Sequence, residues 1–436
     1  MPRVRLRTLA DVKRGLGSIA ALLAIGAMAM AGLLAAPAAN AAKDPVAKKF
    51  EIYLSFSDWD TYEAGSRDGV GDLSVFTGPV STTLSGSKAG SYLITTRVIE
   101  REGSGRRAID TRDTRIEVSV GGGTVLAQAA TEDPTGKPPT GLHILPVVGG
   151  TGAYASARGT LIIAALGSTG KYRLGYDVFV DQSWSQEKVR MPSPSISVVG
   201  ADDTTASWQS AVPGDVIVTT REQGAQRLVI ASTVLERDRD QVTYAHEVLF
   251  TDPDRHVLAR GETTQQIEEI PGQAKTRFAI LGATGDRVSQ RGELRVVPSK
   301  NDGVRLVLRW GAQAGGKESR KSWVDDVKTG SVVGFDGRGG EIDGVSGDMR
   351  NKLRKGRDIG DMDQLAQVFP DTGWWVASSE QTFSEGTMML AGFGPSQAEG
   401  RTWIVIGGTG NFGGASGTAT GIVRSGTWKT KATYRR

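Results

Sequence analysis

The sequence contains no cysteine, and this absence excludes disulfides, thiol catalysis, iron–sulfur clusters and thiolate zinc sites. It holds only three histidines in 436 residues, and no motif around them is typical of metal ligands, so we predict no metal site and no cofactor. Aromatic residues make up 6% of the chain, whereas glycine occurs 58 times. This composition, without a long polar tract, indicates many strands joined by turns and not a disordered chain.

The first 41 residues have the pattern of a secretion signal. Five basic residues lie between Arg3 and Arg14, an apolar stretch covers residues 17–36, and Ala39-Asn40-Ala41 is a small-residue cleavage site. We therefore predict cleavage after Ala41, a secreted (extracellular) mature protein and no membrane partner. Because the apolar stretch is about as long as a membrane-spanning helix, an uncleaved anchor is the alternative.

The mature chain carries no excess of charge. Residues 1–41 contain five of the 52 Lys and Arg and one of the 48 Asp and Glu, so 47 of each kind remain and the formal net charge falls from +4 to zero. The basic character of the full sequence thus belongs to the predicted signal. No general polycation for nucleic acid remains, and we predict no nucleic-acid partner.

Beyond residue 49 the dominant pattern is a short alternating run that ends in glycine. Examples are residues 91–101 (SYLITTRVIER), 114–120 (TRIEVSV) and 227–237 (RLVIASTVLER). Val, Ile, Thr and aromatic residues at period two are typical of strands with one buried face. One segment has a helical period instead: in residues 361–369, Met362, Leu365, Ala366 and Phe369 would share one helix face. We predict a short helix there, packed on a sheet.

A long-period repeat organises the chain. The segments GGTGAYASARG from Gly149, GATGDRVSQRG from Gly282 and GGTGNFGGASG from Gly407 follow one another at steps of 133 and 125 residues. An apolar strand precedes each segment, and a last strand follows about twenty residues later. Because the GGTG-like segments and the strands around them recur at matching spacings, we predict three modules, at residues 42–190, 191–311 and 312–436. The third module is partly degenerate.

Seven or eight short strands in about 130 residues favour an antiparallel barrel, because closure removes the exposed edges of a sheet. The predicted fold class is therefore all-β, with tandem eight-stranded antiparallel barrels. The triplet Gly408, Gly410 and Gly413 also spells the dinucleotide-binding pattern, but the residues after it make a poor helix and no acid follows at the required distance, so we interpret it as a turn.

Residues 143–160 (HILPVVGGTGAYASARGT) closely resemble the signature of dirigent proteins, which belong to the allene oxide cyclase barrel superfamily. Residues 53–59 (YLSFSDW) resemble the first strand of that family, with Asp58 at its acidic position, and residues 71–80 (GDLSVFTGPV) resemble the strand pair that follows. The resemblance covers residues 50–181 well, the second module weakly and the third mainly in its back half.

The resemblance implies an eight-stranded barrel around an apolar cavity. Such barrels are often trimeric in plant members, so a homo-oligomer is left open. Allene oxide cyclases steer the cyclisation of a reactive fatty-acid epoxide, and dirigent proteins steer the coupling or cyclisation of phenolic intermediates that other enzymes generate. The shared mechanism is confinement: an apolar wall holds a reactive ligand in one conformation while a few polar groups hold or protonate it.

Carried over residue by residue, the resemblance implies that Asp58 is the cavity acid and Arg158 the arginine of the signature. The acid that often follows GGTG is missing in the first module, where Ala153 stands, and it recurs as Asp286 in the second. We take Asp58 and Arg158 as candidate catalytic residues and include Asp286 among the candidate ligand contacts.

The residues themselves leave two interpretations of this site open. A buried Asp58 between Phe56 and Trp59 would have a raised pKa suited to proton transfer, whereas at a solvated rim it would only cap the strand. Arg158 could orient an anionic ligand, or it could pair with an aspartate and fix the end of the barrel. Phe56, Trp59 and Tyr154 are candidate ligand contacts, with core packing as the alternative.

The sequence therefore predicts a secreted barrel protein that binds a small apolar or phenolic molecule and steers its stereoselective coupling or cyclisation. Whether the protein is itself an enzyme of the isomerase or cyclase type is left open. The competing function is a non-catalytic extracellular structural or adhesion module. A packed barrel interior would favour the structural module, and an open cavity would favour the binding protein.

Overall fold

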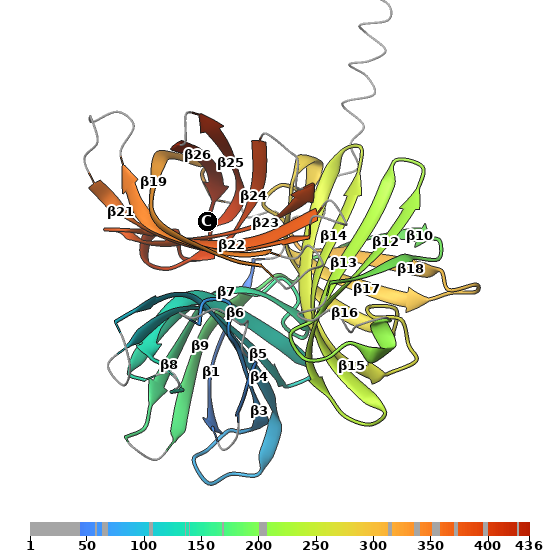
Figure 1. Ribbon diagram of the computed structural model, residues 1–436, viewed down its shortest axis with the longest axis horizontal. Helices are drawn as coiled ribbons and strands as arrows, with labels where there is room; N and C mark the ends of the chain where they lie inside the picture. Colours follow the sequence, from blue (N-terminus) through green and yellow to red (C-terminus); the bar gives the residue numbers. More distant parts are fainter. Residues whose placement is uncertain are drawn as a thin grey trace, which may run out of the picture. The chain divides into compact units, whose positions relative to one another are not determined.

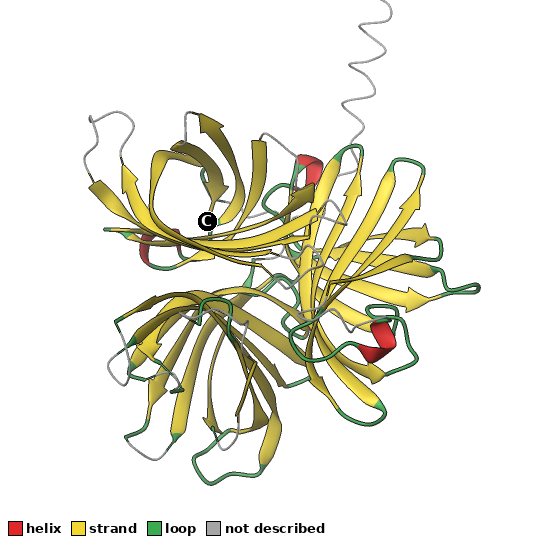
Figure 2. Cartoon of the chain, in the orientation of Figure 1, coloured by secondary structure: helices red, strands yellow, loops and turns green. Residues whose placement is uncertain are grey.

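The structure is a computed structural model, and it describes residues 44–436 apart from 57–58, 63–68, 104–107, 136, 139, 168–169, 200–206, 313–315, 335–340, 351–357, 370–373, 396–399 and 425–426. The predicted secretion signal, residues 1–41, lies outside the described residues. Within the described part, no helix is long and apolar enough to cross a membrane. Strands and turns account for almost all of the described chain (Figure 2).

The first module is a nine-stranded antiparallel sheet in the order β1-β9-β8-β7-β6-β5-β4-β3-β2. Strand β1 also pairs with β3, through Tyr53 with Ser81 and Leu54 with Val80, so that the sheet curls onto itself along a short seam. Its strands are β1 (Val46–Ser55), β2 (Trp59–Tyr62), β3 (Leu73–Ser81), β4 (Lys88–Glu102), β5 (Ile109–Val120), β6 (Gly123–Pro134), β7 (Leu142–Gly152), β8 (Arg158–Ala165) and β9 (Lys171–Val180).

The second module is a nine-stranded sheet in the order β10-β18-β17-β16-β15-β14-β13-β12-β11. The predicted division after residue 190 falls inside β10, which pairs along its whole length with β18 and so belongs to this sheet. The strands are β10 (Ser185–Met191), β11 (Ser195–Val199), β12 (Val216–Gln223), β13 (Gln226–Arg237), β14 (Gln241–Asp252), β15 (Arg255–Gln266), β16 (Thr276–Ala283), β17 (Gly292–Pro298) and β18 (Val304–Trp310), with the 3-10 turns η2 (Trp208–Ser210) and η3 (Gly285–Arg287).

The third module, whose sequence departs most from the repeat, is a closed eight-stranded barrel in which β26 pairs with β19. Figure 1 shows its orange and red strands curling into a ring. The strands are β19 (Ser319–Gly334), β20 (Glu341–Arg350), β21 (Asp358–Phe369), β22 (Trp374–Phe383), β23 (Gly386–Pro395), β24 (Gly400–Gly408), β25 (Ser416–Arg424) and β26 (Thr427–Arg435), with the 3-10 turn η5 (Gly410–Phe412). The all-β fold of tandem barrels is thus confirmed.

The predicted helix at residues 361–369 is wrong, because this segment is strand β21. Met362 and Ala366 point into the core of the third module, while Leu365 and Gln367 on the other face line a cavity between modules. A strand buried on both faces places apolar residues on both parities, and this pattern imitates the spacing of an amphipathic helix.

The internal repeat is confirmed in the backbone. Gly152, Gly285 and Gly410, the last glycines of the three GGTG-like turns, have φ of 58°, 66° and 54°. Four residues further on, Ser156 and Ser289 both have φ of 65°. Left-handed backbone is costly for residues with a side chain, so its recurrence at matching positions shows that the turns share one conformation.

The three modules share a core on their outer faces, where β7, β16 and β24 contact one another. These strands carry the apolar runs that precede each GGTG-like turn, and both of their faces are buried. The shared core consists of Leu126, Val148, Val216, Val218, Val229, Ala231, Leu249, Leu258, Ala279, Leu281, Trp374, Val376, Met389, Ala391, Phe393, Ile404 and Ile406. The modules are therefore joined by continuous hydrophobic packing as well as by the chain.

The first glycine of each repeat faces the next module. A Cβ atom on Gly149 would lie 3.1 Å from the Ala279 Cβ, and one on Gly407 would lie 3.2 Å from the Pro146 Cβ. A Cβ atom on Gly282 would lie 2.5 Å from the Ile404 Cγ2. The contacts run from the first module to the second, from the second to the third and from the third to the first, so each glycine permits the close approach of one pair of modules.

Gly282→Ala is expected to lower the free energy of unfolding by about 1–3 kcal/mol, because an overpacked junction must shift backbone or branched side chains. Urea unfolding followed by tryptophan fluorescence measures this change. The matched control is Gly175→Ala in β9, where an added Cβ would meet no atom within 4 Å. Equal stability of the two variants would contradict the role of Gly282 in module packing.

Candidate functional site

The interior of the first module is filled with apolar and aromatic side chains. Phe56 directly follows β1, and its ring centroid lies 4.4 Å from that of Tyr172, 5.1 Å from that of Phe76 and 5.8 Å from that of Tyr92. These rings belong to one buried cluster that also takes in the inward side chains of β5 to β9. The described residues that point inward at this end therefore pack against one another.

Asp58, the candidate acid, lies outside the described residues, and so does the side chain of Trp59. The backbone of Trp59 belongs to β2, where it pairs with Phe76 of β3. The last described residue before Asp58 is Phe56, whose amide donates a hydrogen bond to the Gly170 carbonyl (3.1 Å).

Tyr154 and Arg158 lie at the other end of the first module, near the start of β1. The Tyr154 ring is tilted against Phe50, with their centroids 5.5 Å apart, and the Lys48 ammonium lies 4.8 Å from the Tyr154 centroid. Arg158 forms an ion pair with Asp181 (Nη1 to Oδ1, 2.8 Å). The structure thus gives Arg158 a carboxylate partner at the barrel end and does not bring it together with Phe56.

Asp286 belongs to η3 in the second module and is exposed, with 59% of its side-chain surface accessible. Its carboxylate lies 3.8 Å from the Arg255 guanidinium and 3.6 Å from that of Arg287. It shares no described contact with the interior of the first module. An exposed carboxylate between two arginines contributes to surface electrostatics.

A pocket of about 300 Å³ opens at the seam where β1 meets β3. Its lining combines apolar side chains, which include the core residues Leu54 and Val80, with two exposed lysines, Lys88 at the start of β4 and Lys171 at the start of β9. The lining consists of Tyr53, Leu54, Ser55, Pro79, Val80, Ser81, Leu84, Gly86, Lys88 and Lys171. We call it the seam pocket; its apolar floor and cationic rim suit a small apolar molecule with an acidic group.

A second hollow of about 370 Å³ lies between the first and second modules. Its lining is polar and includes three carboxylates, Glu117, Glu236 and Glu262. Burial raises the pKa of Glu117 to about 7, although Arg260 opposes the shift. Burial, followed by the charge of Glu117, raises the pKa of Glu262 to about 8. Among the described residues, no group of three His, Cys, Asp or Glu side chains is placed to hold a metal ion.

The sequence alone gave no reason to single out the two lysines of the seam pocket. Lys88 follows a Gly/Ser-rich turn and Lys171 opens a strand 83 positions later. Only the pairing of β1 with both β3 and β9 brings them to one pocket. The signal is a lysine at the first residue of each of the two strands, β4 and β9, that flank the closing pair of β1 and β3. This signal can be recognised only when the order of the strands in the sheet is known.

No protein family model matches the chain, and no curated protein matches it. Among solved structures, a protein described as pyocyanin demethylase aligns with 19% identity and a TM-score of 0.23, over 30% of this chain and 98% of that one.

Proposed function

We propose that this chain is a secreted binding protein whose first module holds a small apolar or phenolic molecule in the seam pocket. The observation that carries the proposal is the composition of that pocket, in which apolar side chains that reach the core lie beneath two lysines. Its volume of about 300 Å³ is at the lower end of the range of small-molecule sites, roughly 300–1,000 Å³.

The two lysines define the chemistry of the ligand. Lys88 and Lys171 are both exposed and lie on different strands of the pocket rim. An ammonium group attracts a carboxylate or phenolate, while Leu54, Val80 and Leu84 offer apolar surface to a ring. A phenolic acid, or another aromatic ring that carries one negative charge, fits both parts.

The resemblance of residues 143–160 to dirigent proteins supports the same class of ligand. We include membership of the dirigent and allene oxide cyclase superfamily in the proposal, and with it steering of a coupling or cyclisation by confinement. The described lining of the seam pocket offers lysine, serine and tyrosine groups, which suit orientation of a bound molecule.

The test is a fluorescence titration of the protein with 8-anilinonaphthalene-1-sulfonate, an aromatic anion that brightens in apolar surroundings. The titration uses protein purified from culture medium. The mass of this protein also shows whether residues 1–41 have been removed. Saturable binding is expected, and Lys88→Gln combined with Leu84→Glu should weaken it at least tenfold, because the change removes a cation and adds an anion at the rim.

The matched control is Lys300→Gln, a change to an exposed lysine in the turn between β17 and β18. It should leave the titration unchanged. Equal binding to the pocket variant and to this control would show that the dye binds elsewhere, and the seam pocket would lose its assignment.

A second function has a specific observation in its favour. The described inward residues of the first module fill its interior, and the three modules share one hydrophobic core, as expected for a non-catalytic extracellular structural or adhesion module. If neither the dye nor a panel of phenolic acids binds to the seam pocket, this function takes the first place.

A further inference from the structure

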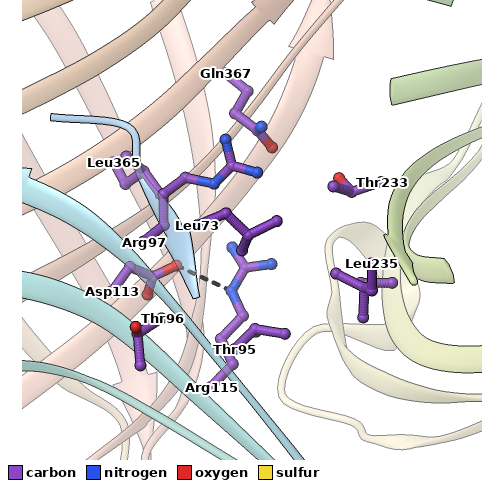
Figure 3. A pocket seen from close by; sticks show the side chains of 11 residues that line it. Leu73, Thr95, Thr96, Arg97, Asp113, Arg115, Thr233, Leu235, Leu365 and Gln367 are labelled. Atoms are coloured by element: carbon purple, nitrogen blue, oxygen red, sulfur yellow. Dashed lines mark hydrogen bonds and ion pairs between the residues drawn. The ribbon is translucent and has the colours of Figure 1, made fainter. Parts of the chain in front are cut away.

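A small cavity lies where all three modules meet, remote from the seam pocket. It has a volume of about 30 Å³, room for one or two water molecules or one monatomic ion. Its lining comes from β3, β4 and β5 of the first module, β13 and β14 of the second and β21 of the third: Leu73, Thr95, Thr96, Arg97, Asp113, Arg115, Thr233, Leu235, Ala245, Leu365 and Gln367 (Figure 3). We call it the junction cavity.

Two of its lining residues are largely buried, and the described residues supply no acceptor for the donors that they turn toward it. Arg97 is 8% exposed, and it forms no hydrogen bond or ion pair with any residue that the structure describes. Gln367 is also 8% exposed, and within the same described part its Nε2 has no acceptor. Figure 3 shows the Arg97 guanidinium and the Gln367 amide turned toward the space between the modules, where both line the junction cavity. A buried donor without an acceptor, such as the Gln367 Nε2, is rare because it loses its hydrogen bonds to water.

The carboxylates nearby are already engaged by other cations. Asp113 accepts hydrogen bonds from the Arg115 Nε (2.9 Å) and the Gln128 Nε2 (2.6 Å). Glu247 Oε1 lies 2.7 Å from nitrogens of both Arg115 and Arg260. The charge of Glu117 also interacts with Arg115 and Arg260. Among the described residues, Arg115 and Arg260 thus have carboxylate partners within 4 Å, whereas Arg97 has none.

Two carboxylates act on Arg97 from a distance. Asp113 and, after it, Asp72 raise the Arg97 pKa, but Asp113 is bonded to Arg115, and the Asp72 Oδ2 lies 3.9 Å from a nitrogen of Arg101. Burial, and after it the charge of Arg115, nevertheless lowers the pKa of Arg97 to about 10. Within the described part of the chain, the charge of Arg97 thus has no carboxylate within ion-pair distance to compensate it.

We propose that the junction cavity binds a single small anion of halide size, chloride being the common one. The ion would accept hydrogen bonds from the Arg97 guanidinium and the Gln367 Nε2, and its charge would compensate that of Arg97. Water could fill the same volume, but it would supply no negative charge. A polyatomic anion such as sulfate is too large for about 30 Å³.

The position of this site gives the anion a structural consequence. Arg97 belongs to β4 of the first module and Gln367 to β21 of the third, while Leu235 and Thr233 of the second module close the cavity. A bound ion would therefore link the modules, and it would stabilise the joined state relative to the unfolded chain in proportion to its occupancy.

The first experiment is anomalous diffraction from crystals of the mature protein grown or soaked in sodium bromide. We expect one anomalous peak in the junction cavity, within hydrogen-bond distance of Arg97 and Gln367. A cavity that shows ordinary water density and no anomalous signal at high bromide concentration would overturn the proposal.

The second experiment is thermal unfolding in sodium chloride against sodium gluconate at equal ionic strength, with gluconate as an anion too large to enter. The melting temperature should rise with chloride in a saturable manner. Arg97→Met, which keeps a long side chain without charge, should abolish this chloride-specific rise.

The matched control for this variant is Arg305→Met, at an exposed position of β18, which should retain the full chloride response. An identical chloride response in the Arg97 variant and the wild type would overturn the site. If the Arg97 variant does not fold, Gln367→Leu and the bromide experiment on the wild type decide the question.

Discussion

Replacement of Arg291 by methionine is expected to lower the free energy of unfolding by about 3 kcal/mol or more. Arg291 is 3% exposed and precedes β17 in the second module. Its Nη2 donates hydrogen bonds to the carbonyls of Ile406 (2.6 Å) and Ala415 (2.7 Å) in the third module. Its Nη1 donates to the carbonyls of Ala157 (3.2 Å) and Val147 (3.4 Å) in the first.

The physical reason is that one guanidinium satisfies carbonyl groups from both neighbouring modules at a buried place. Hydrogen bonds to a charged donor contribute about 1.5–3 kcal/mol each, and buried acceptors left without a donor lose their solvation as well. Burial lowers the pKa of Arg291 to about 9, which opposes part of this gain and keeps the expected loss well below the sum of four such bonds.

Urea unfolding at pH 7, with Arg305→Met as the exposed control, measures the effect. A difference of less than about 0.5 kcal/mol between the two variants, the usual scale of surface substitutions, would show that Arg291 does not hold the modules together.

The second large effect expected is a loss of stability as the pH rises from about 5 to 8, caused in part by Glu380. This residue of β22 is 9% exposed, and its Oε2 accepts a hydrogen bond from the Ala130 amide of the first module (2.6 Å). Burial raises the pKa of Glu380 to about 7, from 4.5 in an exposed carboxyl, although this hydrogen bond opposes the shift.

The sign follows from proton binding. Between pH 4.5 and about 7, the folded chain holds a proton on Glu380 that the unfolded chain has released, so stability falls as the pH rises through this interval. A shift of this size corresponds to at most about 3 kcal/mol at 1.36 kcal/mol per pKa unit. Glu117 and Glu262 have raised pKa values and contribute with the same sign.

Glu380→Gln keeps an oxygen for the Ala130 amide and removes the charge. The variant should match the wild type near pH 5 and be more stable by about 1–3 kcal/mol near pH 8. The difference between the two proteins is the quantity to follow, because burial lowers the pKa of His246 to about 3 and so destabilises both as the pH falls below about 6.5.

The control for this series is Glu268→Gln, at an exposed position before β16. It should follow the wild type at every pH. If Glu380→Gln were equally stable relative to the wild type at pH 5 and pH 8, the carboxyl would be ionised in the folded protein throughout, and its assignment as a proton-holding group at the module junction would be wrong.

Local patterns predicted much of the fold. Alternation at period two is a property of the strand itself, so runs such as residues 91–101 and 227–237 indicated β4 and β13 directly. The GGTG-like segments predicted three equivalent turns, because positive φ at Gly152 and its counterparts is a local backbone requirement that glycine meets. The same patterns fixed the number of modules.

The helix expected at residues 361–369 shows where local reasoning fails. Met362 and Leu365 are both buried, one in the core of the third module and the other at the junction cavity. Which faces of a strand are covered depends on the neighbours that pack on it, and a second module on the outer face doubles the apolar positions. The apolar residues of such a strand then do not follow a single period along the sequence.

The sequence by itself determined that the chain is built from three barrel-like modules of antiparallel strands, because strand alternation and turn glycines act over a few neighbouring residues. Only the tertiary structure decided which residues meet. Lys88 and Lys171 share a pocket because β1 closes on β3, and Arg97 and Gln367 face one cavity because three outer faces pack together. Burial, and with it the charge balance at the module junction, is a property of that packing and not of any one segment.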